Sequence, residues 1–364
     1  MPIREESFRI GCGRYLQGAG FLEKAGDEVL RLGSSALIIG GRTALEITRA
    51  RLEESIRQKC KKYEFIVHTG TCNAERAKEI AAIAKEKEYD VIVGVGGGVI
   101  CDFAKLCAYY ALLPVLNIPT SSATCAAYTP LSVCYTPEGK TVGSQHYLYE
   151  VNAVLVDTQV IATQPVRLFL AGVFDALAKF VEIKQRYTVG RQDYPLGLDY
   201  AYIVSKYSFE LLSTNMEQCI RDLEQGTLSD ALEKVIFTTI AATGVISGIA
   251  RGSNQTAIAH KFYETTRKLF YDKTREFTHG EIVGVGLLIQ NHFNNEVENN
   301  ELLLALMRKH ALPCCVDALH IERCDANLEA YYSAICNSSA IENDAEAQKL
   351  RASLKYLWEF SCHD

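Results

Sequence analysis

The sequence predicts an α/β protein with an N-terminal Rossmann-like parallel-sheet domain and an all-helical C-terminal domain. Apolar, β-branched runs that stop at glycine alternate with amphipathic helical segments in the first half, and strand signals cease after about Thr163. Strands that alternate with helices require crossover connections, which give a parallel sheet with helices on both faces. We therefore expect domains at residues 1–162 and 163–364. Because no low-complexity linker separates them, we expect a site in the cleft between them.

Each expected element rests on its own pattern. In the first half, glycine-rich residues 5–20 suggest an edge strand and turns. Strands are expected at 35–41, 64–68, 90–95, 116–119 and 153–157, and helices at 22–32, 43–62 and 73–87. In the second half, helical patterning covers 176–187, 196–212, 231–249, 256–270, 281–293, 301–310 and 327–336.

Bulk composition excludes several classes of protein. The 364 residues are 48% hydrophobic with a net charge of −6, and their positive residues are scattered, so we expect a globular protein without a nucleic-acid partner. The apolar stretch Val235 to Ala250 is short and interrupted by polar residues, which favours a buried core helix and no membrane. Thirteen cysteines without a CxxC pair, and no signal peptide at the start, predict reduced thiols and a cytoplasmic location.

Gly96-Gly97-Gly98 follow the strand expected at 90–95, and a probable helix begins at Val99. This turn fits a phosphate cradle at a helix N-terminus and a plain tight turn equally well, because it lacks the third glycine of the dinucleotide fingerprint. Thr120, Ser121 and Ser122 follow the next strand and offer hydroxyls at the neighbouring carboxyl end of the sheet. Ligands of parallel sheets bind there, so the two stretches together favour a nucleotide.

One carboxylate and two imidazoles stand out in the helical half: Asp175, His260 and His279. Each also has a structural explanation. Asp175 fits a helix N-cap, His260 fits a hydrogen-bonded core histidine, and His279 lies in a capping box of Thr278 and Glu281. Oxygen and nitrogen donors of this kind suit a divalent metal with an open position for substrate, but spacing alone does not bring them together.

Several motifs in order resemble the iron-containing (group III) alcohol dehydrogenase family, in its glycerol dehydrogenase-like branch. They are GVGGGxxxD at 94–102, PTxxATCA at 119–126, PLSVxYTPEG at 130–139, VLVDT at 154–158, LAGVxDALAKxxE at 170–182, AIAH at 257–260 and HGExVGxG at 279–286. The resemblance implies a divalent metal, zinc or iron, on Asp175, His260 and His279. It implies NAD(H) or NADP(H) against Gly97, Gly98, Asp102, Thr120, Ser121, Ser122, Thr129, Leu131 and Tyr135, and a homo-oligomer.

Departures from the family pattern bear on the substrate. Glycerol dehydrogenases carry an aspartate where this chain has Cys125. The sequence from Ala123 to Val133 more closely resembles the hydroxycarboxylate dehydrogenases of the family. We therefore expect Cys125 and Tyr128 to face a 2-hydroxy acid or 2-oxo acid, with glycerol or another polyol as the alternative. Cations available to an acid are Arg251, Lys179 and Lys261.

Further departures concern the cofactor and the metal. The second strand ends at Gly40-Gly41-Arg42 without the acidic residue that binds a ribose diol in NAD-using relatives, so Arg42 favours the 2′-phosphate of NADP(H). Phe174 replaces the glycine usual before the metal aspartate, and Tyr263 replaces a second histidine of the family. The predicted activity is metal-assisted hydride transfer. Further alternatives are a dehydroquinate synthase-like lyase and a nucleotide-binding relative without turnover.

Overall fold

The computed structural model describes residues 10–187, 196–250 and 255–360. Arg251, one of the cations named above, lies outside the described residues. The chain forms two compact units. One comprises the described part of Arg9–Pro165 together with Thr214–Val245, and the other comprises the described parts of Val166–Ser213 and Ile246–Asp364. The chain passes from one unit to the other after Pro165, which is near the predicted domain boundary at 162. The later helical segment Thr214–Val245, however, belongs to the same unit as the sheet. The division into two functional domains stays a prediction.

A six-stranded sheet is the centre of the first unit, in the order β1-β8-β5-β4-β2-β3. Every neighbouring pair in it is parallel, as predicted from the alternation of strands and helices. Residues of β2, β4, β5 and β8 are buried throughout, which explains why these strands are continuous apolar runs. The strands are β1 Tyr15–Gly18, β2 Ser35–Gly40, β3 Lys62–Val67, β4 Val91–Gly96, β5 Val115–Pro119 and β8 Ala153–Asp157.

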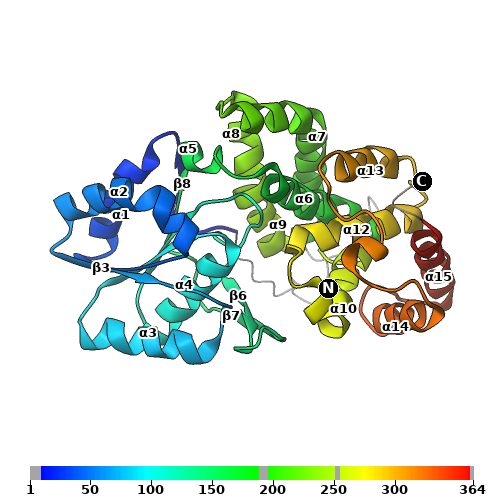
Figure 1. Cartoon of the computed structure of the whole chain (residues 1–364), viewed down its shortest axis with the longest axis horizontal. Coiled ribbons are helices and arrows are strands. Elements are labelled where there is room, and N and C mark those ends of the chain that lie inside the picture. Colours follow the sequence, from blue (N-terminus) through cyan, green and yellow to red (C-terminus); the bar gives the residue numbers. More distant parts are fainter. Residues whose placement is uncertain (1–9, 188–195, 251–254, 361–364) are drawn as a thin grey trace, which may run out of the picture. The chain divides into compact units, whose positions relative to one another are not determined.

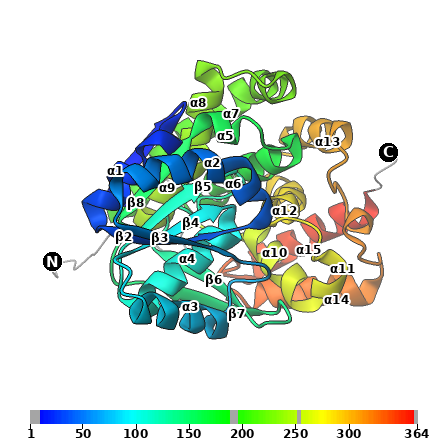
Figure 2. The same cartoon turned by 60° about the vertical axis from the view of Figure 1, so that its left-hand side comes forward.

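Helices cover both faces of this sheet. In Figures 1 and 2, α1 and α2 lie on one face, and α3 and α4 lie on the other. The core between the sheet and the first pair contains Leu22, Val29, Ile38, Leu52, Ile56 and Val93. The helices of this layer arrangement are α1 Ala25–Leu32, α2 Arg42–Lys59, α3 Ala74–Glu86 and α4 Gly98–Ala111, and the short α5 Thr158–Ile161 follows β8.

The order of strands reverses between β2 and β4. The chain leaves β2 for β3 on one side and returns past β2 to β4 on the other, while β2 and β4 pair directly with Gly40 opposite Val95. Open α/β sheets bind ligands in the crevice at such a switch point, outside the carboxyl ends of the strands. The glycine turns after β2 and β4 both lie at this position.

A hairpin of β6 Leu131–Tyr135 and β7 Thr141–His146 forms a separate two-stranded sheet that the sequence analysis missed. All of β7 except Gln145 is exposed, so its residues lack the alternation of apolar and polar side chains that marks a half-buried strand.

The remainder of the described chain is helical, as predicted, although α15 was not foreseen and α6 begins ten residues before the expected start at 176. A π-helical turn, Thr238–Ala242, connects α8 to α9. These helices are α6 Val166–Arg186, α7 Leu196–Gln225, α8 Asp230–Phe237, α9 Thr243–Ala250, α10 Ile258–Leu269, α11 Tyr271–Thr274, α12 His279–Phe293, α13 Asn299–Lys309, α14 Asp325–Cys336 and α15 Asp344–Glu359.

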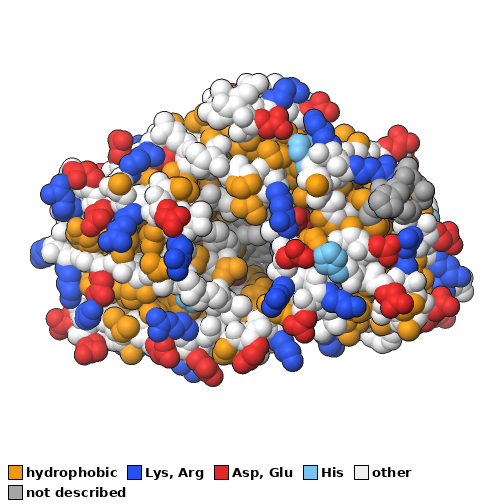
Figure 3. Space-filling model, viewed as in Figure 1, with side chains coloured by type: hydrophobic (Ala, Val, Ile, Leu, Met, Phe, Trp, Pro, Cys, Tyr) orange, Lys and Arg blue, Asp and Glu red, His pale blue; other side chains and the backbone are white. Residues whose placement is uncertain are grey.

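Two bulk expectations can be compared with the structure. The helical segment Asp230–Ala250 is long and apolar enough to cross a membrane by length and composition, but 61% of its most apolar window is buried inside the protein, as in a core helix. Eleven of the described cysteines are free thiols, whereas Cys315 is disulfide-bonded. Figure 3 shows acidic and basic side chains interspersed over the visible face.

Candidate active site

Three helices of the second unit bring Asp175, His260 and His279 together. Asp175 Oδ1 lies 3.3 Å from His260 Nε2 and 3.4 Å from His279 Nε2, and the candidate ligand atoms all lie within 4.8 Å of one another. Asp175 and His260 are buried, and the His279 side chain is partly exposed. One carboxylate oxygen and two imidazole nitrogens are a suitable donor set for zinc or iron.

Asp175 does not cap a helix, contrary to the structural alternative considered for it. Because α6 begins at Val166, Asp175 lies well inside that helix among residues that are all buried from Phe169 to Ile183. A carboxylate in the middle of a buried helix needs polar or charged partners. Its neighbours are the two histidines and Lys179, which lies one turn later on the same helix.

His260 is oriented by Glu182, a buried residue of α6 that is 1% exposed. One oxygen of Glu182 lies 2.5 Å from His260 Nδ1, and the other accepts hydrogen bonds from the backbone N–H groups of Ala257 and His260 at the start of α10. A carboxylate that faces Nδ1 holds the ring proton on that nitrogen and leaves the Nε2 lone pair available. Glu182 therefore caps α10 and prepares His260 as a ligand.

Lys179 is a buried cation beside the same donor atoms. Its Nζ is 3.2 Å from His260 Nε2 and 3.9 Å from Asp175 Oδ1, and the residue is 5% exposed. Burial alone would raise the pKa of Asp175, but Lys179 and His279 hold it well below its usual range. The site thus keeps its carboxylate ionised, which is the form that binds a metal.

His279 is the first residue of α12, and Thr278 and Glu281 form the predicted capping box around it. Burial lowers the pKa of His279, against the opposing effect of Asp175, and so favours the neutral ring that a metal requires. Tyr263 packs edge-on against His279, with ring centroids 4.2 Å apart. The tyrosine that replaces the second family histidine therefore supports a ligand ring.

Glycines allow α12 to approach its neighbours closely. A Cβ at Gly280 would lie 1.8 Å from the carbonyl oxygen of Ala171 on α6, and one at Gly286 would lie 2.6 Å from that of Ala259 on α10. A Cβ at Gly284 would lie 2.8 Å from the ring of Phe174. Phe174, which replaces the glycine usual before the metal aspartate, is thus accommodated by Gly284 on the facing helix.

In the first unit, the structure brings the glycine turn and the hydroxyl loop together. Gly97 is the N-cap of α4, and a Cβ at that position would lie 3.5 Å from Ser121 Oγ. A Cβ at Gly98 would lie 2.8 Å from Thr124 Oγ1, and the Thr120 N–H donates to the Gly96 carbonyl. The hydroxyls of Ser121 and Thr124 therefore lie close to the start of α4, and the backbone N–H groups of a helix N-terminus are suited to bind phosphate.

Ser122 has an internal role. It is fully buried, and both its backbone N–H and its Oγ are hydrogen-bonded to Gln164. These bonds fix the loop after β5 against the chain that follows α5.

Asp102 also has structural partners. Its Oδ1 pairs with Lys105 at 2.8 Å, and its Oδ2 accepts the Val133 N–H. The Lys105 ammonium donates to the carbonyls of Ala126, Thr129 and Leu131 and so organises the loop that leads to β6. Tyr135 ends β6, where its N–H donates to the Cys72 carbonyl. Contact of these residues with a dinucleotide stays a prediction.

The chain is similar to known proteins over most of its length. Residues 12–158 match the iron-containing alcohol dehydrogenase family. The glycerol dehydrogenase of Thermotoga maritima is 32% identical over 295 residues, covering 76% of this chain and 74% of that protein. The chain belongs to the iron-containing alcohol dehydrogenase family. Hydroxycarboxylate dehydrogenase A of Escherichia coli is 27% identical over 292 residues, covering 79% of this chain and 78% of that protein.

The fold of the family extends over the whole chain. The solved glycerol dehydrogenase of Schizosaccharomyces pombe aligns with a TM-score of 0.83, covering 98% of this chain and 91% of that one at 22% identity. Both the family and the fold predicted from the motifs are therefore confirmed. As an iron-containing alcohol dehydrogenase, the chain is an oxidoreductase whose family implies a nicotinamide dinucleotide and a divalent metal.

The remaining predicted residues of this alcohol dehydrogenase are placed as follows. Arg42 is exposed at the first position of α2, next to the switch point. Cys125 is partly buried and accepts backbone hydrogen bonds from Tyr128 and Thr129. The Tyr128 hydroxyl donates to the Ile10 carbonyl. Contact of Cys125 and Tyr128 with substrate stays a prediction.

Of the described cations proposed for an acid substrate, only Lys179 lies in the cluster of ligands. Lys261 pairs with Glu264 at 2.6 Å on α10. Glu182 and Lys105 were not identified as functional by the sequence analysis. Asp175, Lys179 and Glu182 recur at positions i, i+4 and i+7 of a largely buried helix, and this polar row is the sequence signal that would have identified Glu182.

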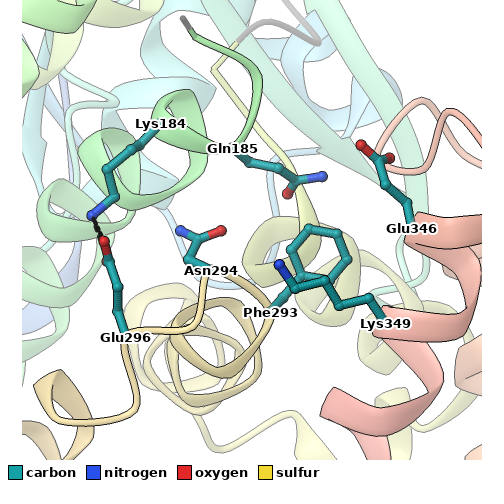
Figure 4. Close-up of a pocket in the computed structure, with 7 residues that line it drawn as sticks. All are labelled: Lys184, Gln185, Phe293, Asn294, Glu296, Glu346 and Lys349. Atoms are coloured by element: carbon teal, nitrogen blue, oxygen red, sulfur yellow. Dashed lines mark hydrogen bonds and ion pairs between the residues drawn. The ribbon is translucent and has the colours of Figure 1, made fainter.

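A pocket of about 290 Å³ lies elsewhere in the helical unit of this dehydrogenase (Figure 4). Three of its charges lie in ion pairs: Lys184 contacts Glu296, and Glu346 contacts Arg186 at 3.8 Å. The lining residues are Lys184, Gln185, Phe293, Asn294, Glu296, Glu346 and Lys349, and they include none of the predicted site residues.

Proposed function

We propose that this protein is a metal-dependent, NAD(P)-dependent dehydrogenase of small polyhydroxy alcohols. The observation that carries the proposal is the buried cluster of Asp175, His260 and His279 in a member of the iron-containing alcohol dehydrogenase family. The polyol, which the sequence analysis treated as the alternative, is now preferred over the hydroxy acid because a glycerol dehydrogenase is the relative with 32% identity.

Asp175, His260 and His279 would hold the metal, and a bound divalent ion would act as a Lewis acid on the substrate oxygen. Glu182 holds His260 in the tautomer with its lone pair on Nε2. Lys179 adds a positive charge beside the ionised Asp175, which favours an anionic oxygen at the site. A bound nicotinamide dinucleotide would supply the hydride chemistry, and the N-terminus of α4 with Ser121 and Thr124 would bind its pyrophosphate.

A specific observation supports 2-hydroxy acids as a second candidate. Lys179 is a buried ammonium 3.2 Å from a ligand nitrogen, and a substrate carboxylate would pair with such a cation. The relative at 27% identity is a hydroxycarboxylate dehydrogenase. The two substrate classes predict different responses to one substitution. Lys179→Met should raise KM for 2-hydroxy acids about tenfold or more while leaving KM for glycerol within about threefold.

The experiment is a parallel screen. Purified protein of measured metal content is assayed with NAD⁺ and NADP⁺ against glycerol, propane-1,2-diol and a series of 2-hydroxy acids, and in reverse against the matching carbonyl compounds. We expect oxidation of a vicinal diol that is lost in His260→Ala and His279→Ala, both of which still bind nucleotide. Nucleotide binding without turnover of any alcohol or carbonyl across the metals tested would contradict the proposal.

Cofactor choice is tested in the same screen. Arg42 is exposed beside the carboxyl end of β2 and carries no competing ion pair among the described residues, so we predict a preference for NADP(H). Arg42→Ala should raise KM for NADP⁺ about tenfold and leave KM for NAD⁺ unchanged. Equal effects on both nucleotides would place Arg42 away from the 2′-phosphate.

A further inference from the structure

Two free cysteines of the compact unit that contains the sheet have their side chains in contact. Cys72 lies in the loop between β3 and α3, and Cys134 lies in β6. Their thiols are hydrogen-bonded to each other. Cys72 is fully buried, whereas Cys134 is only partly buried. The pair therefore has one member that is partly accessible to solvent and one that is shielded behind it.

Hydrogen bonds of the neighbouring residues hold the two segments together independently of the thiols. The Tyr135 N–H donates to the Cys72 carbonyl at 2.8 Å, and the Thr71 hydroxyl donates to the Thr136 carbonyl at 3.1 Å. Chains joined in this way lie at the spacing that a disulfide bridges, about 4.4 to 6.8 Å between Cα atoms. The register of β6 against β7 also shifts between Cys134 and Tyr135, and such irregularities re-aim side chains. A bond between the two sulfur atoms therefore needs no large movement of the backbone.

The hydrogen bond makes the two thiols chemically unequal. The thiol of Cys72 lowers the pKa of Cys134 to about 7, against the opposing effects of burial and of Asp102, and Lys105 also favours the thiolate. The same hydrogen bond, together with burial, raises the pKa of Cys72. The thiolate is the nucleophilic form of cysteine, and redox-active cysteines combine a low pKa with access to solvent and a second thiol nearby. Cys134 has all three properties, and Cys72 is the second thiol.

We propose that Cys134 and Cys72 are a redox modification site, at which hydrogen peroxide produces a reversible disulfide. The Cys134 thiolate attacks one peroxide oxygen. The S–O bond forms, the O–O bond breaks, and the departing hydroxide takes up a proton and leaves as water. The Cys72 sulfur then attacks the Cys134 sulfur, the S–S bond forms, the S–O bond breaks, and a second water carries away the Cys72 proton. The two thiols lose two electrons, and the peroxide is reduced to two waters.

Reduction by a dithiol restores the pair, because a thiolate of the reductant attacks one sulfur of the disulfide and its second thiol completes the exchange. The disulfide would join the loop before α3 to β6 by a covalent bond. It forms within one compact unit and does not involve Asp175, His260 or His279. Its formation is therefore measured without turnover and does not depend on the proposed dehydrogenase activity.

Peptide mapping of the native full chain tests the proposal. The protein is titrated with hydrogen peroxide, alkylated and digested with trypsin and chymotrypsin, which together separate Cys134 from Cys107 and Cys125. We expect a peptide that links Cys72 to Cys134 and is lost after treatment with dithiothreitol. Cys60→Ser is the matched control, because Cys60 is another partly buried free cysteine of the same unit, and it should form the same link. Recovery of Cys72 and Cys134 unlinked, over a titration that ends with oxidation of other cysteines of the chain, would overturn the proposal.

The roles of the two thiols are tested with Cys72→Ser. Its hydroxyl keeps the hydrogen-bond donor beside Cys134 but cannot resolve a sulfenic acid, so dimedone should label Cys134 in this variant and little of the wild type. Equal labelling of Cys134 in both proteins, with unchanged circular dichroism spectra, would show that Cys72 is not the resolving thiol.

Thermal unfolding gives a second readout. The disulfide closes a long loop of chain, so peroxide should raise Tm of the wild type by a few degrees and leave Tm of Cys72→Ser unchanged. An equal shift in both proteins would assign the stabilising bond to other cysteines and overturn the proposal.

Discussion

Replacement of Glu182 by glutamine should weaken metal binding while retaining the fold. The side-chain oxygen of the glutamine must keep accepting from the backbone N–H groups of Ala257 and His260, which lie 2.7 and 2.8 Å from the carboxylate in the wild type. The amide NH₂ group then faces His260 Nδ1. Two donors cannot share that hydrogen bond, so the ring proton moves to Nε2, and the lone pair that would bind the metal is lost.

The magnitude follows from this change of tautomer. Loss of a carboxylate that orients a ligand histidine weakens metal binding about 10- to 100-fold, or roughly 1.4 to 2.7 kcal/mol. The metal-free protein should lose about 1 to 3 kcal/mol of unfolding free energy, because a buried charged hydrogen bond is replaced by a neutral one. Nucleotide binding should not change, since every nucleotide residue predicted here lies in the other compact unit.

Metal affinity is measured by competition with a chromophoric chelator, and folding by circular dichroism. Glu329→Gln is a suitable control because it makes the same chemical change in an exposed residue of the same unit that pairs with Arg351. A Glu182→Gln protein that is folded and binds metal within about threefold of the wild type would refute the tautomer argument.

Three other predictions concern stability. Gly280→Ala should destabilise the protein by about 3 kcal/mol or more in denaturant titrations, because its Cβ would lie 1.8 Å from the Ala171 carbonyl oxygen; a loss below about 1 kcal/mol would contradict the packing described. Asp90 accepts hydrogen bonds from the backbone and side chains of Ser34 and Ser35, and these bonds lower its pKa. These bonds contribute about 1 kcal/mol to the free energy of unfolding, because the group is partly exposed. The contribution should be present above the unfolded pKa of about 3.9 and lost as the pH falls through the folded pKa. The difference in unfolding free energy between the wild type and Asp90→Asn should therefore close below about pH 4. Chelation of the metal should lower Tm by several degrees in the wild type, because an ion at 100 times its Kd contributes about 2.7 kcal/mol, and should not shift Tm of His260→Ala.

The parallel sheet and the glycine turns could be predicted because each buried strand is a short apolar run bounded by turn residues. Val91–Gly96 is such a run, and it is buried at every position. The hairpin of β6 and β7 could not be predicted. Its exposed strand β7 lacks the alternation of apolar and polar residues, and its conformation depends on pairing with β6.

The metal ligands could be named from motifs but not from spacing. Asp175 and His260 are 85 residues apart, and only the packing of α6 against α10 and α12 brings them together. Glu182 was one of 44 acidic residues, and its role became visible only when its carboxylate was found on the His260 ring. The start of α6 was predicted too late because its first turns lack a capping signal, and the helix cap considered as the structural alternative for Asp175 was wrong for the same reason.

The glycines of α12 have a consequence for how this site can change. Where Gly280 and Gly286 meet the carbonyl groups of Ala171 and Ala259, main chain contacts main chain, and no side chain sets the distance between the helices. Substitutions elsewhere in the core therefore leave the donor atoms in register. Side chains that line the site can therefore change the substrate that binds there while these main-chain contacts keep the ligand helices at the same distance.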